Sequence, residues 1–407
     1  MSVSIDDIRR AAEQLRGAVV RTPCTHSRKI SAIVGADVFV KYENQQFTSS
    51  FKDRGACVKL LSLTEAQRGA GVIAMSAGNH AQGVAYHAQR LGIPATIVMP
   101  RGTPNVKVSQ TLAFGADVRL EGETVEEAAQ AAEALQSERD LTFIHPYDDD
   151  RIIAGQGTAA LEMFEDVPDL DTLIVPIGGG GLIAGTALVA EARDPAIEVV
   201  GVEAELYPSM RQMLSGEPVA CGGQTLAEGI AVKAPGKRTL AIAKRLVREI
   251  LLVSERDIER AICLFLEAER TVAEGAGAAG LAALLANPGR FAGRRLGLIL
   301  CGGNIDTRML ASLLMRALVR DGRIARLRIE ISDRPGTLAA VSGLVAETQA
   351  NILDVAHQRL FPELPAKLAD LDMVIETRDQ AHVDDVVAKL TGAGYTVRRL
   401  ENSATSD

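Results

Sequence analysis

The sequence predicts an α/β protein with a parallel sheet covered by helices on both faces, followed by a smaller ferredoxin-like βαββαβ domain. Three observations carry this prediction. Short apolar runs alternate with helical patterns along most of the chain. Glycine is frequent (37 residues) while aromatic residues make up only 3%, which suits tight turns and close helix–sheet packing. After about residue 320 the order of the elements changes.

Strands and helices alternate through the first part of the chain. Apolar runs predict strands at residues 71–75, 95–99, 141–145, 172–177 and 198–202. Helical periodicity predicts helices at residues 80–91, 104–114, 123–138 and 181–192. Such repeated strand–helix units build a parallel sheet, and ligands of these sheets bind at the carboxyl ends of the strands.

The last part of the chain is expected to form a separate domain. Strands are predicted at 326–332, 351–360, 370–377 and 395–400, and helices at 337–347 and 383–390. The order βαββαβ within about 75 residues is that of the ferredoxin-like module. We therefore expect a first domain over residues 1–320, a linker at 320–325 and a second domain over 326–401.

Length and composition limit the class of protein. At about 150 residues per domain, 407 residues allow two or three domains. Hydrophobic residues make up 47% and charged residues 24%, which excludes a disordered or fibrous chain. The formal net charge of -8 argues against nucleic acid or an anionic membrane as a partner.

The cysteines and the N-terminal residues predict a cytoplasmic protein. Five cysteines are scattered without a CxxC pair, which disfavours both a disulfide framework and a zinc site. No apolar run reaches the roughly 18 residues of a membrane span. Residues 1–16 have early acids and no apolar signal core. We therefore expect neither export nor a membrane partner.

The first candidate for chemistry is the segment SSFKDRG at residues 49–55. The serine pair precedes a helical pattern, so Ser49 or Ser50 is expected to cap a helix with Lys52 in its first turn. The positive end of the helix dipole disfavours the charged amine there. A lowered pKa suits a lysine that attacks a carbonyl or holds a Schiff base. An exposed lysine at a helix start is the alternative interpretation.

The second candidate is MSAGNH at residues 75–80, between a predicted strand and a helix. Backbone N–H groups at a helix N-terminus bind anions, and Ser76 and Asn79 add donors for a carboxylate or a phenolate oxygen. A polar turn is the alternative. The His80 side chain by itself is expected to be packed or to cap the helix.

The third candidate is GGGGL at residues 178–182. Consecutive glycines lose much backbone entropy on folding, so a plain turn explains them poorly. Their N–H groups fit a phosphate monoester. Alternatively, the spacing to Ala184 and the acidic Glu203 loosely fit a dinucleotide.

The fourth candidate is CGGN at residues 301–304, after an apolar run. A lone buried cysteine such as Cys301 is usually a small core residue. The segments 274–277 and 228–229 are expected to serve backbone packing only.

These four motifs together resemble the fold-type II pyridoxal-phosphate enzymes, specifically the serine/threonine dehydratase family. Their order and approximate spacing are similar to those of the family over roughly residues 5–318. The resemblance implies two parallel-sheet subdomains with helices on both faces. The small subdomain, about 43–145, would be inserted in the large one.

The resemblance implies a role for each motif. Lys52 would hold pyridoxal 5'-phosphate as a Schiff base and later move the Cα proton, with Phe51 against the cofactor ring. Asn79 would bond the phenolic oxygen, and Cys301 would face the ring nitrogen. The implied phosphate site is Gly178, Gly179, Gly180, Gly181 and Leu182. The implied substrate site is Ser76, Ala77, Gly78, Asn79 and His80.

A neutral thiol opposite the ring nitrogen favours rapid loss of a β-leaving group, so the resemblance implies β-elimination of water from a hydroxy amino acid. In the family, such a reaction converts L-threonine to 2-oxobutanoate and ammonia and begins the route to isoleucine. An L-serine dehydratase or a serine racemase is the alternative, because one methyl group is worth only ~1–3 kcal/mol and leaves no motif. A non-catalytic sensor is disfavoured by the intact Lys52. A dinucleotide site explains neither Lys52 nor the segment 76–80.

Two positions bear on the serine alternatives. Serine racemases carry a serine where this chain has Ala77, so we expect slow racemisation. Serine racemases also place a cation near the segment that resembles Glu203. Ser209 stands where an acidic ligand is expected, so the sequence leaves metal binding open.

The C-terminal segment resembles an ACT domain, a small amino-acid-sensing module. Its motif is DRPGTL at residues 333–338, followed by Asn351 and Ile352. The resemblance implies an effector site at Asp333, Gly336, Asn351 and Ile352, with isoleucine or valine as the ligand. A dimerisation module without a ligand is the alternative. Because ACT domains usually pair, a homodimer or homotetramer is expected.

Overall fold

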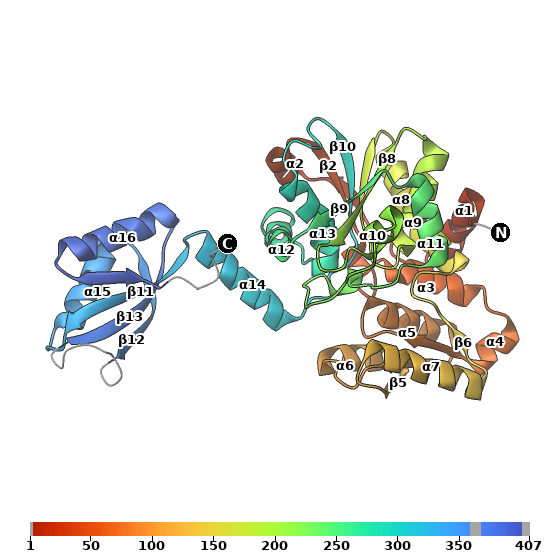
Figure 1. Ribbon diagram of the computed structural model, residues 1–407, viewed down its shortest axis with the longest axis horizontal. Helices are drawn as coiled ribbons and strands as arrows, with labels where there is room; N and C mark the ends of the chain where they lie inside the picture. Colours follow the sequence, from red (N-terminus) through yellow and green to blue (C-terminus); the bar gives the residue numbers. More distant parts are fainter. Residues whose placement is uncertain (1–2, 359–367, 401–407) are drawn as a thin grey trace. The chain divides into compact units, whose positions relative to one another are not determined.

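The computed structural model describes residues 3–358 and 368–400, and the chain forms two compact units, residues 1–305 and 306–407. The first unit contains two sheets and the second contains one (Figure 1). No helix in the described residues is long and apolar enough to cross a membrane.

A six-stranded sheet forms the larger part of the first unit, in the order β1-β2-β10-β7-β8-β9. Its strands are β1 (Cys24–His26), β2 (Asp37–Tyr42), β7 (Thr172–Pro176), β8 (Glu198–Ala204), β9 (Glu249–Val253) and β10 (Arg295–Leu300). All neighbours run parallel except β1 and β2. Strand β7 is buried along its whole length, as expected of a central parallel strand that is covered on both faces.

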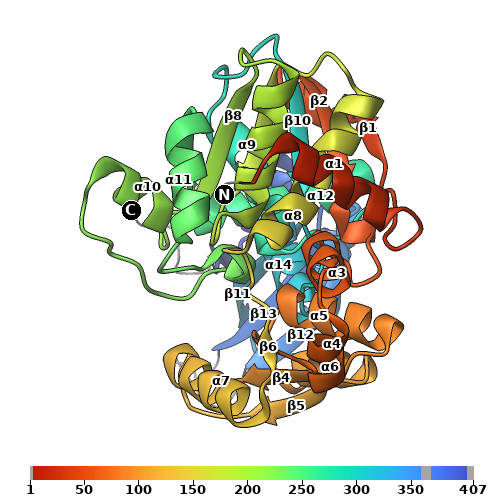
Figure 2. The ribbon, with the colours of Figure 1, turned by 90° about the vertical axis from the view of Figure 1, so that its right-hand side faces the viewer.

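Helices cover both faces of this sheet, with α8, α9 and α11 on one side and α12 and α13 on the other (Figures 1 and 2). The helices of this part are α1 (Ile5–Leu15), α2 (Arg28–Val34), α8 (Asp150–Asp166), α9 (Gly181–Arg193), α10 (Ser209–Ser215), α11 (Lys237–Leu246), α12 (Glu255–Glu269) and α13 (Gly275–Ala286), with short 3-10 turns η1 (Glu43–Gln45) and η2 (Glu228–Ile230). Helices α8 and α9 approach so closely that a Cβ on Gly185 would lie 2.6 Å from the nitrogen of Gly157.

The smaller sheet of the first unit lies, in sequence, between β2 and β7. Its strands β3 (Val72–Met75), β4 (Ala95–Met99), β5 (Asp117–Leu120) and β6 (Thr142–Phe143) are all parallel, in the order β5-β4-β3-β6. The accompanying helices are α3 (Lys52–Leu61), α4 (Glu65–Ala70), α5 (Asn79–Leu91), α6 (Asn105–Ala113) and α7 (Val125–Arg139). An aliphatic core of its own holds this part together, with Leu60, Val84 and Ile97 fully buried.

Two details of the smaller sheet differ from the sequence expectation. Strand β5 was not predicted, because charged residues alternate within DVRL and the strand stays mostly exposed at the sheet edge. The strand predicted at 141–145 covers only Thr142–Phe143. The ring of His145 instead accepts hydrogen bonds from the backbone N–H groups of Tyr147 (3.2 Å) and Asp148 (2.8 Å), which turns the chain into a loop.

The second unit has a four-stranded antiparallel sheet in the order β12-β13-β11-β14. Its elements are α14 (Thr307–Arg320), β11 (Ile324–Ser332), α15 (Thr337–Glu347), β12 (Asn351–Gln358), β13 (Leu368–Glu376), α16 (Gln380–Gly392) and β14 (Thr396–Arg399). After α14, the order is the predicted βαββαβ. The predicted fold class, parallel sheets with helices followed by a ferredoxin-like domain, is confirmed.

The expected linker at 320–325 is partly wrong. Strand β11 already begins at Ile324, and both Ile324 and Ala325 are buried, with Ala325 in the core of the second unit. The expected strand end at 359–360 and the expected domain end at residue 401 lie outside the described residues.

Candidate active site

The loop before α3 is held by the chain that follows β10. The N–H of Phe51 donates to the carbonyl of Cys301 at 3.0 Å, and the N–H of Gly303 donates to the carbonyl of Ser49 at 2.9 Å. This pairing places Lys52, the first residue of α3, beside the end of β10.

The expected capping of α3 by Ser49 or Ser50 is wrong. Phe51 occupies the N-cap position and makes no side-chain cap bond. Ser50 instead forms a bridge with Gly302, and Ser49 adopts a left-handed backbone with φ of 56°. The strand-like pairing therefore decides the loop conformation, and the local preference of serine for caps does not.

The Lys52 amine donates a hydrogen bond to the carbonyl of Pro146 at 2.8 Å. Burial lowers the pKa of Lys52 to about 8, although nearby Cys301 and Glu274 favour the charged form. A lowered pKa of Lys52 was expected from the sequence. The structure attributes the lowering to burial of the amine away from water rather than to the helix dipole. The ring of Phe51 has its centre 5.2 Å from the Lys52 nitrogen.

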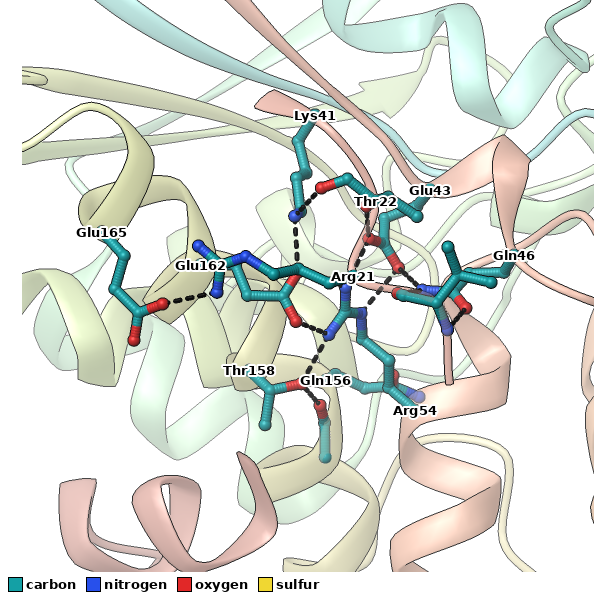
Figure 3. A network of polar contacts seen from close by, with 12 residues as sticks. Arg21, Thr22, Lys41, Glu43, Gln46, Arg54, Gln156, Thr158, Glu162 and Glu165 are labelled. Carbon is teal, nitrogen blue, oxygen red and sulfur yellow. Dashed lines mark hydrogen bonds and ion pairs between the residues drawn. The ribbon is translucent and has the colours of Figure 1, made fainter. Parts of the chain in front are cut away.

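A buried ionic cluster, consisting of Lys41, Glu43, Arg54 and Glu162, anchors the first turn of α3 (Figure 3). The Arg54 guanidinium donates to both carboxylate oxygens of Glu43 (2.7 and 2.8 Å) and to both of Glu162 (2.7 and 2.8 Å). Lys41 donates to Glu162 and to the carbonyl of Thr22. Two cations thus face two carboxylates, so the charges within this cluster balance.

The cluster has a positional consequence. Although burial favours the neutral acid, Arg54 holds the pKa of Glu43 below its usual value, so this pair stays ionised. Arg54 follows Lys52 by two residues. Its two bidentate contacts, to Glu43 and Glu162, therefore fix the direction in which α3 begins. No local sequence pattern indicates this cluster.

The segment 76–80 leads from β3 into α5. The N–H of Gly78 donates to the hydroxyl of Ser76 at 3.2 Å, and Asn79 is the first residue of the helix. The His80 ring is buried and lies 2.8 Å from the carbonyl of Ile144. Burial lowers the pKa of His80 to about 3, so its side chain is a neutral packed group, as expected.

The Asn79 side chain meets Glu274, a residue that the sequence analysis assigned only to a packing turn. Its Nδ2 donates to Oε1 of Glu274 at 2.7 Å, and its Oδ1 accepts from Nδ2 of Asn304 at 2.8 Å. Burial raises the pKa of Glu274 to about 7. The expectation of a purely structural 274–277 turn is therefore wrong. No local signal reveals a contact between residues 195 positions apart.

The glycine loop connects β7 to α9. A Cβ on Gly179 would lie 2.1 Å from the Tyr147 ring, and one on Gly180, whose φ is +92°, would lie 2.5 Å from Met210. The carbonyl of Gly179 accepts from the hydroxyl of Thr239 at 2.6 Å. Only glycine fits at positions 179 and 180, because neighbouring side chains pack directly against the loop there. The loop is held firmly at the N-terminus of α9, the position expected for an anion site.

Cys301 directly follows β10 and is buried. Burial and the neighbouring Glu274 raise the pKa of its thiol, so the side chain stays neutral. The carbonyl of Cys301 accepts from the N–H of Phe51, the residue before Lys52, and a Cβ on the next residue, Gly302, would lie 3.1 Å from Nδ2 of Asn79. The structure therefore gathers Lys52, Asn79 and Cys301 into one region, as the sequence motifs suggested.

The glycine loop is joined to this region through one short segment. The carbonyl of Pro146 receives the Lys52 amine, and the next residue, Tyr147, packs against Gly179. The motifs meet at the carboxyl ends of the strands, where ligands of parallel sheets bind.

The segment considered for a cation is engaged in protein contacts. The Glu203 carboxylate accepts from the N–H groups of Met210 (2.8 Å) and Arg211 (3.0 Å), and the Ser209 hydroxyl donates to the carbonyl of Val232 (2.6 Å). Among residues 3–358 and 368–400, no group of three or more His, Cys, Asp or Glu is placed to hold a metal ion.

The expected effector residues do not meet within one chain. Asn351 opens β12 and donates to Glu376 at 3.2 Å, at the end of the sheet where β11 begins. Asp333 follows the last residue of β11, at the opposite end, with Gly336 at the N-cap of α15. At ~3.3 Å per residue, the length of β11 separates the two groups by more than 20 Å. The expected single pocket is therefore not formed by these residues of one chain.

This fold and this site define a pyridoxal-phosphate-dependent enzyme with a ferredoxin-like C-terminal domain. Residues 15–302 match the family described as pyridoxal-phosphate dependent enzyme, and residues 325–394 match the ACT domain. The chain belongs to the pyridoxal-phosphate-dependent enzyme family. This result confirms the resemblance drawn from the motifs.

Individual relatives are similar over most of their length. An L-threonine ammonia-lyase of Thermotoga maritima is 43% identical over 97% of this chain and 99% of its own. The structure of maize serine racemase covers 79% of this chain and 99% of its own, with 34% identity and a TM-score of 0.73. Threonine deaminase isoform 2 of Solanum lycopersicum covers 78% and 91%, with 32% identity and a TM-score of 0.72.

The residues of the site fit the cofactor of this family. A lysine amine with a lowered pKa suits a Schiff base, and the tightly packed glycine loop at the N-terminus of α9 suits a phosphate. The neutral thiol of Cys301 suits a ring nitrogen that is not protonated. Pyridoxal phosphate is therefore the cofactor of this protein, as predicted.

Proposed function

We propose that this protein eliminates the β-hydroxyl of L-threonine as water, and that hydrolysis of the resulting enamine releases ammonia and 2-oxobutanoate. The observation that carries the proposal is Lys52, a desolvated amine whose pKa is lowered to about 8, beside a neutral Cys301 thiol. The near full-length similarity to an L-threonine ammonia-lyase supports threonine as the substrate.

Each motif has a proposed task. Lys52 binds the cofactor with Phe51 against its ring, Asn79 bonds the phenolic oxygen, and Cys301 faces the ring nitrogen. The glycine loop, Gly178 to Leu182, holds the phosphate. The substrate carboxylate is bound at residues 76–80, where the start of α5 supplies N–H groups.

The bound pyridoxal phosphate supplies the electron sink that makes the Cα proton of an amino acid removable. Lys52 takes that proton on its Nζ, and a pKa near 8 leaves a useful fraction of neutral amine at neutral pH. The β-hydroxyl leaves as water, and hydrolysis of the released enamine gives the 2-oxo acid and ammonia. The carbonyl of Pro146 keeps the Lys52 amine in position while it carries the proton.

A serine-directed activity is the second candidate, because the structure of maize serine racemase covers most of this chain. Ala77 supports elimination over racemisation. A methyl group cannot protonate the second face of Cα, the task that the family resemblance assigns to a serine at this position in racemases.

The experiment is a 2-oxo-acid assay of the purified protein with L-threonine and with L-serine. We expect turnover of L-threonine, and Lys52→Ala should abolish it together with the visible absorbance of the bound cofactor. Lys59→Ala is the matched control, since Lys59 lies on the same helix and pairs with Asp149. Turnover by Lys52→Ala at the wild-type rate would refute the site. A clear preference for L-serine would favour the second candidate.

We further propose that an amino acid regulates this reaction through the ACT domain. Isoleucine is the expected inhibitor and valine the alternative ligand, if the reaction begins the route to isoleucine. Since Asp333 and Asn351 lie at opposite ends of one sheet, a second copy in the reverse direction is needed to bring them together. A homodimer or homotetramer is therefore expected. The cytoplasm is the expected compartment, supported by free cysteines throughout the described chain.

A further inference from the structure

Three side chains from separate segments form a continuous chain of hydrogen bonds around Asn79. Nδ2 of Asn304 donates to the carbonyl of Thr48 at 2.7 Å and to Oδ1 of Asn79 at 2.8 Å. Nδ2 of Asn79 donates in turn to Oε1 of Glu274 at 2.7 Å. The chain therefore runs from a backbone carbonyl to a carboxyl group.

The fixed end of this chain determines which way the Asn79 amide points. A backbone carbonyl only accepts, so Asn304 presents its Nδ2 to Thr48, and the same nitrogen faces Asn79. The Asn79 atom that receives this bond is Oδ1, which leaves Nδ2 on the side of Glu274. Glu274 uses one of the two hydrogens on that nitrogen, and the other remains to be donated within the site.

The Glu274 carboxylate is placed for this contact. Glu274 is the N-cap residue of α13, yet its side chain makes no cap bond, and its backbone N–H donates to the carbonyl of Gly302 at 3.1 Å. A Cβ on Gly302 would lie 2.4 Å from Oε1 of Glu274 and 3.1 Å from Nδ2 of Asn79. Only glycine at position 302 leaves room for the carboxylate and the amide to meet.

We infer that Glu274 is a positioning residue that, together with Asn304, holds the Asn79 amide so that its second N–H is directed to the phenolic oxygen of pyridoxal phosphate. This inference rests on the role proposed above for Asn79. Glu274 acts through Asn79, by accepting one hydrogen bond and thereby fixing the direction of the other.

The test measures the affinity of cofactor-depleted protein for pyridoxal phosphate by equilibrium dialysis, in a cycle of Asn79→Ala, Glu274→Ala and the double variant. Each single change is expected to weaken binding about 10-fold or more, the value of one hydrogen bond to a charged group. The double variant is expected to bind about as well as Asn79→Ala alone, because Glu274 has nothing left to position. If the fold-loss of affinity in the double variant equals the product of the two single losses, the inference is wrong.

Two further variants separate orientation from charge. Glu274→Gln keeps an oxygen that can accept from Asn79, so it should bind the cofactor within about 3-fold of the wild type. If it binds as weakly as Glu274→Ala, charge is decisive and the inference is wrong. Glu228→Ala is the matched control, since Glu228 is exposed, pairs with Lys107 and acts on Glu274 only through its charge. It should leave binding unchanged, and a loss equal to that of Glu274→Ala would also overturn the inference.

Thermal unfolding of each variant shows that it is folded under the conditions of dialysis. The visible absorbance of the bound cofactor gives a second measure, and it should shift in Asn79→Ala and Glu274→Ala alike. A wild-type protein that does not bind pyridoxal phosphate would remove the proposed function itself. A wild type that binds, with a Glu274→Ala variant that binds equally well, would remove only this inference.

Discussion

The two units of the chain differ in whether the cations that pair with a buried carboxylate are themselves buried. In the first unit Lys41, Glu43 and Arg54 are fully buried and paired with one another or with Glu162. In the second unit the buried core is largely aliphatic, with residues such as Leu327, Ile329 and Leu371. Its main ionic group, Asp372 with Arg326 and Arg328, alternates with the core residues along β11 and β13 and so lies on the opposite face of the sheet.

The difference reflects what each unit has to hold in place. Burying a charge costs several kcal/mol unless it is fully paired and hydrogen-bonded, so such groups are kept where a fixed position matters. In the first unit that position is the start of α3, from which Lys52 projects. The second unit has a continuous apolar core, and its buried Asp372 pairs with Arg326 and Arg328, whose side chains are partly exposed.

The largest expected effect is on the buried cluster. Arg54→Ala should lower the free energy of unfolding of the first unit by ~3–5 kcal/mol, because the fully buried Glu43 loses its charged partner while Glu162 keeps only Lys41. Urea unfolding followed by circular dichroism measures this change. Exposed salt bridges stabilise a protein by about 1 kcal/mol or less. A loss that small would mean that burial does not make this cluster more stabilising than an exposed ion pair.

The second prediction concerns the separation of the two units. A chain that ends at Asp321, which keeps α14 but lacks the sheet of the second unit, should keep turnover of L-threonine, since the residues of the proposed site all lie in the first unit. It should lose any response to isoleucine or valine, a coupling of ~1–3 kcal/mol that changes threonine affinity roughly 5- to 150-fold. Steady-state kinetics with and without each amino acid measures both properties.

Two substitutions sharpen this prediction in the full-length chain. Gly336→Val and Asn351→Ala should each reduce the response while leaving the turnover of L-threonine intact. An unchanged isoleucine response in both would place the effector elsewhere. Isothermal titration that detects no isoleucine or valine beyond the active site would exclude the regulatory role.

A smaller effect is expected within the first unit from Ala77→Ser. The new hydroxyl gives the loop before α5 a second proton donor, so formation of D-amino acid relative to 2-oxo acid should increase. Chiral chromatography of the products measures the ratio, with the wild type giving little D-amino acid. Comparable rates of racemisation and elimination in the wild type would contradict the role assigned to Ala77.

The smallest effect is expected at the ionic group of the second unit. Arg328→Ala should lower the free energy of unfolding by only ~0.2–1 kcal/mol, because Arg326 still pairs with Asp372 and water reaches the partly exposed arginine side chains. The hydrogen bonds from Arg328 and Arg326 hold the pKa of Asp372 below its ordinary value of 3.8. The stabilisation that ionised Asp372 gives to the fold is therefore complete above pH 3.8, and it is lost as the pH falls through the lowered pKa.

Acid unfolding of the second unit measures this last contribution. Asp372→Asn should be less stable than the wild type at neutral pH, and the difference should shrink below pH 3.8. A difference that grows on acidification would contradict the sign of the pKa shift.

Local sequence patterns determined most of the elements and the order of the motifs. The fully buried β4 and β7 and the helix α9 were predicted because their apolar runs and glycine boundaries are properties of short segments. Strand β5 was missed for the same reason, since its charged residues at an exposed edge carry no apolar run. The ferredoxin-like order of the last domain was also readable, because each element follows the previous one directly.

Only the tertiary structure decided how distant residues meet. Glu274 contacts Asn79 across 195 positions, and Arg54 contacts Glu162 across 108, and neither pair has a local signature. The lowered pKa of Lys52 was expected from the sequence, but its cause, burial, is a property of the assembled site. The sequence specifies these contacts through the whole fold, because burial and hydrogen bonding depend on every segment that packs around them.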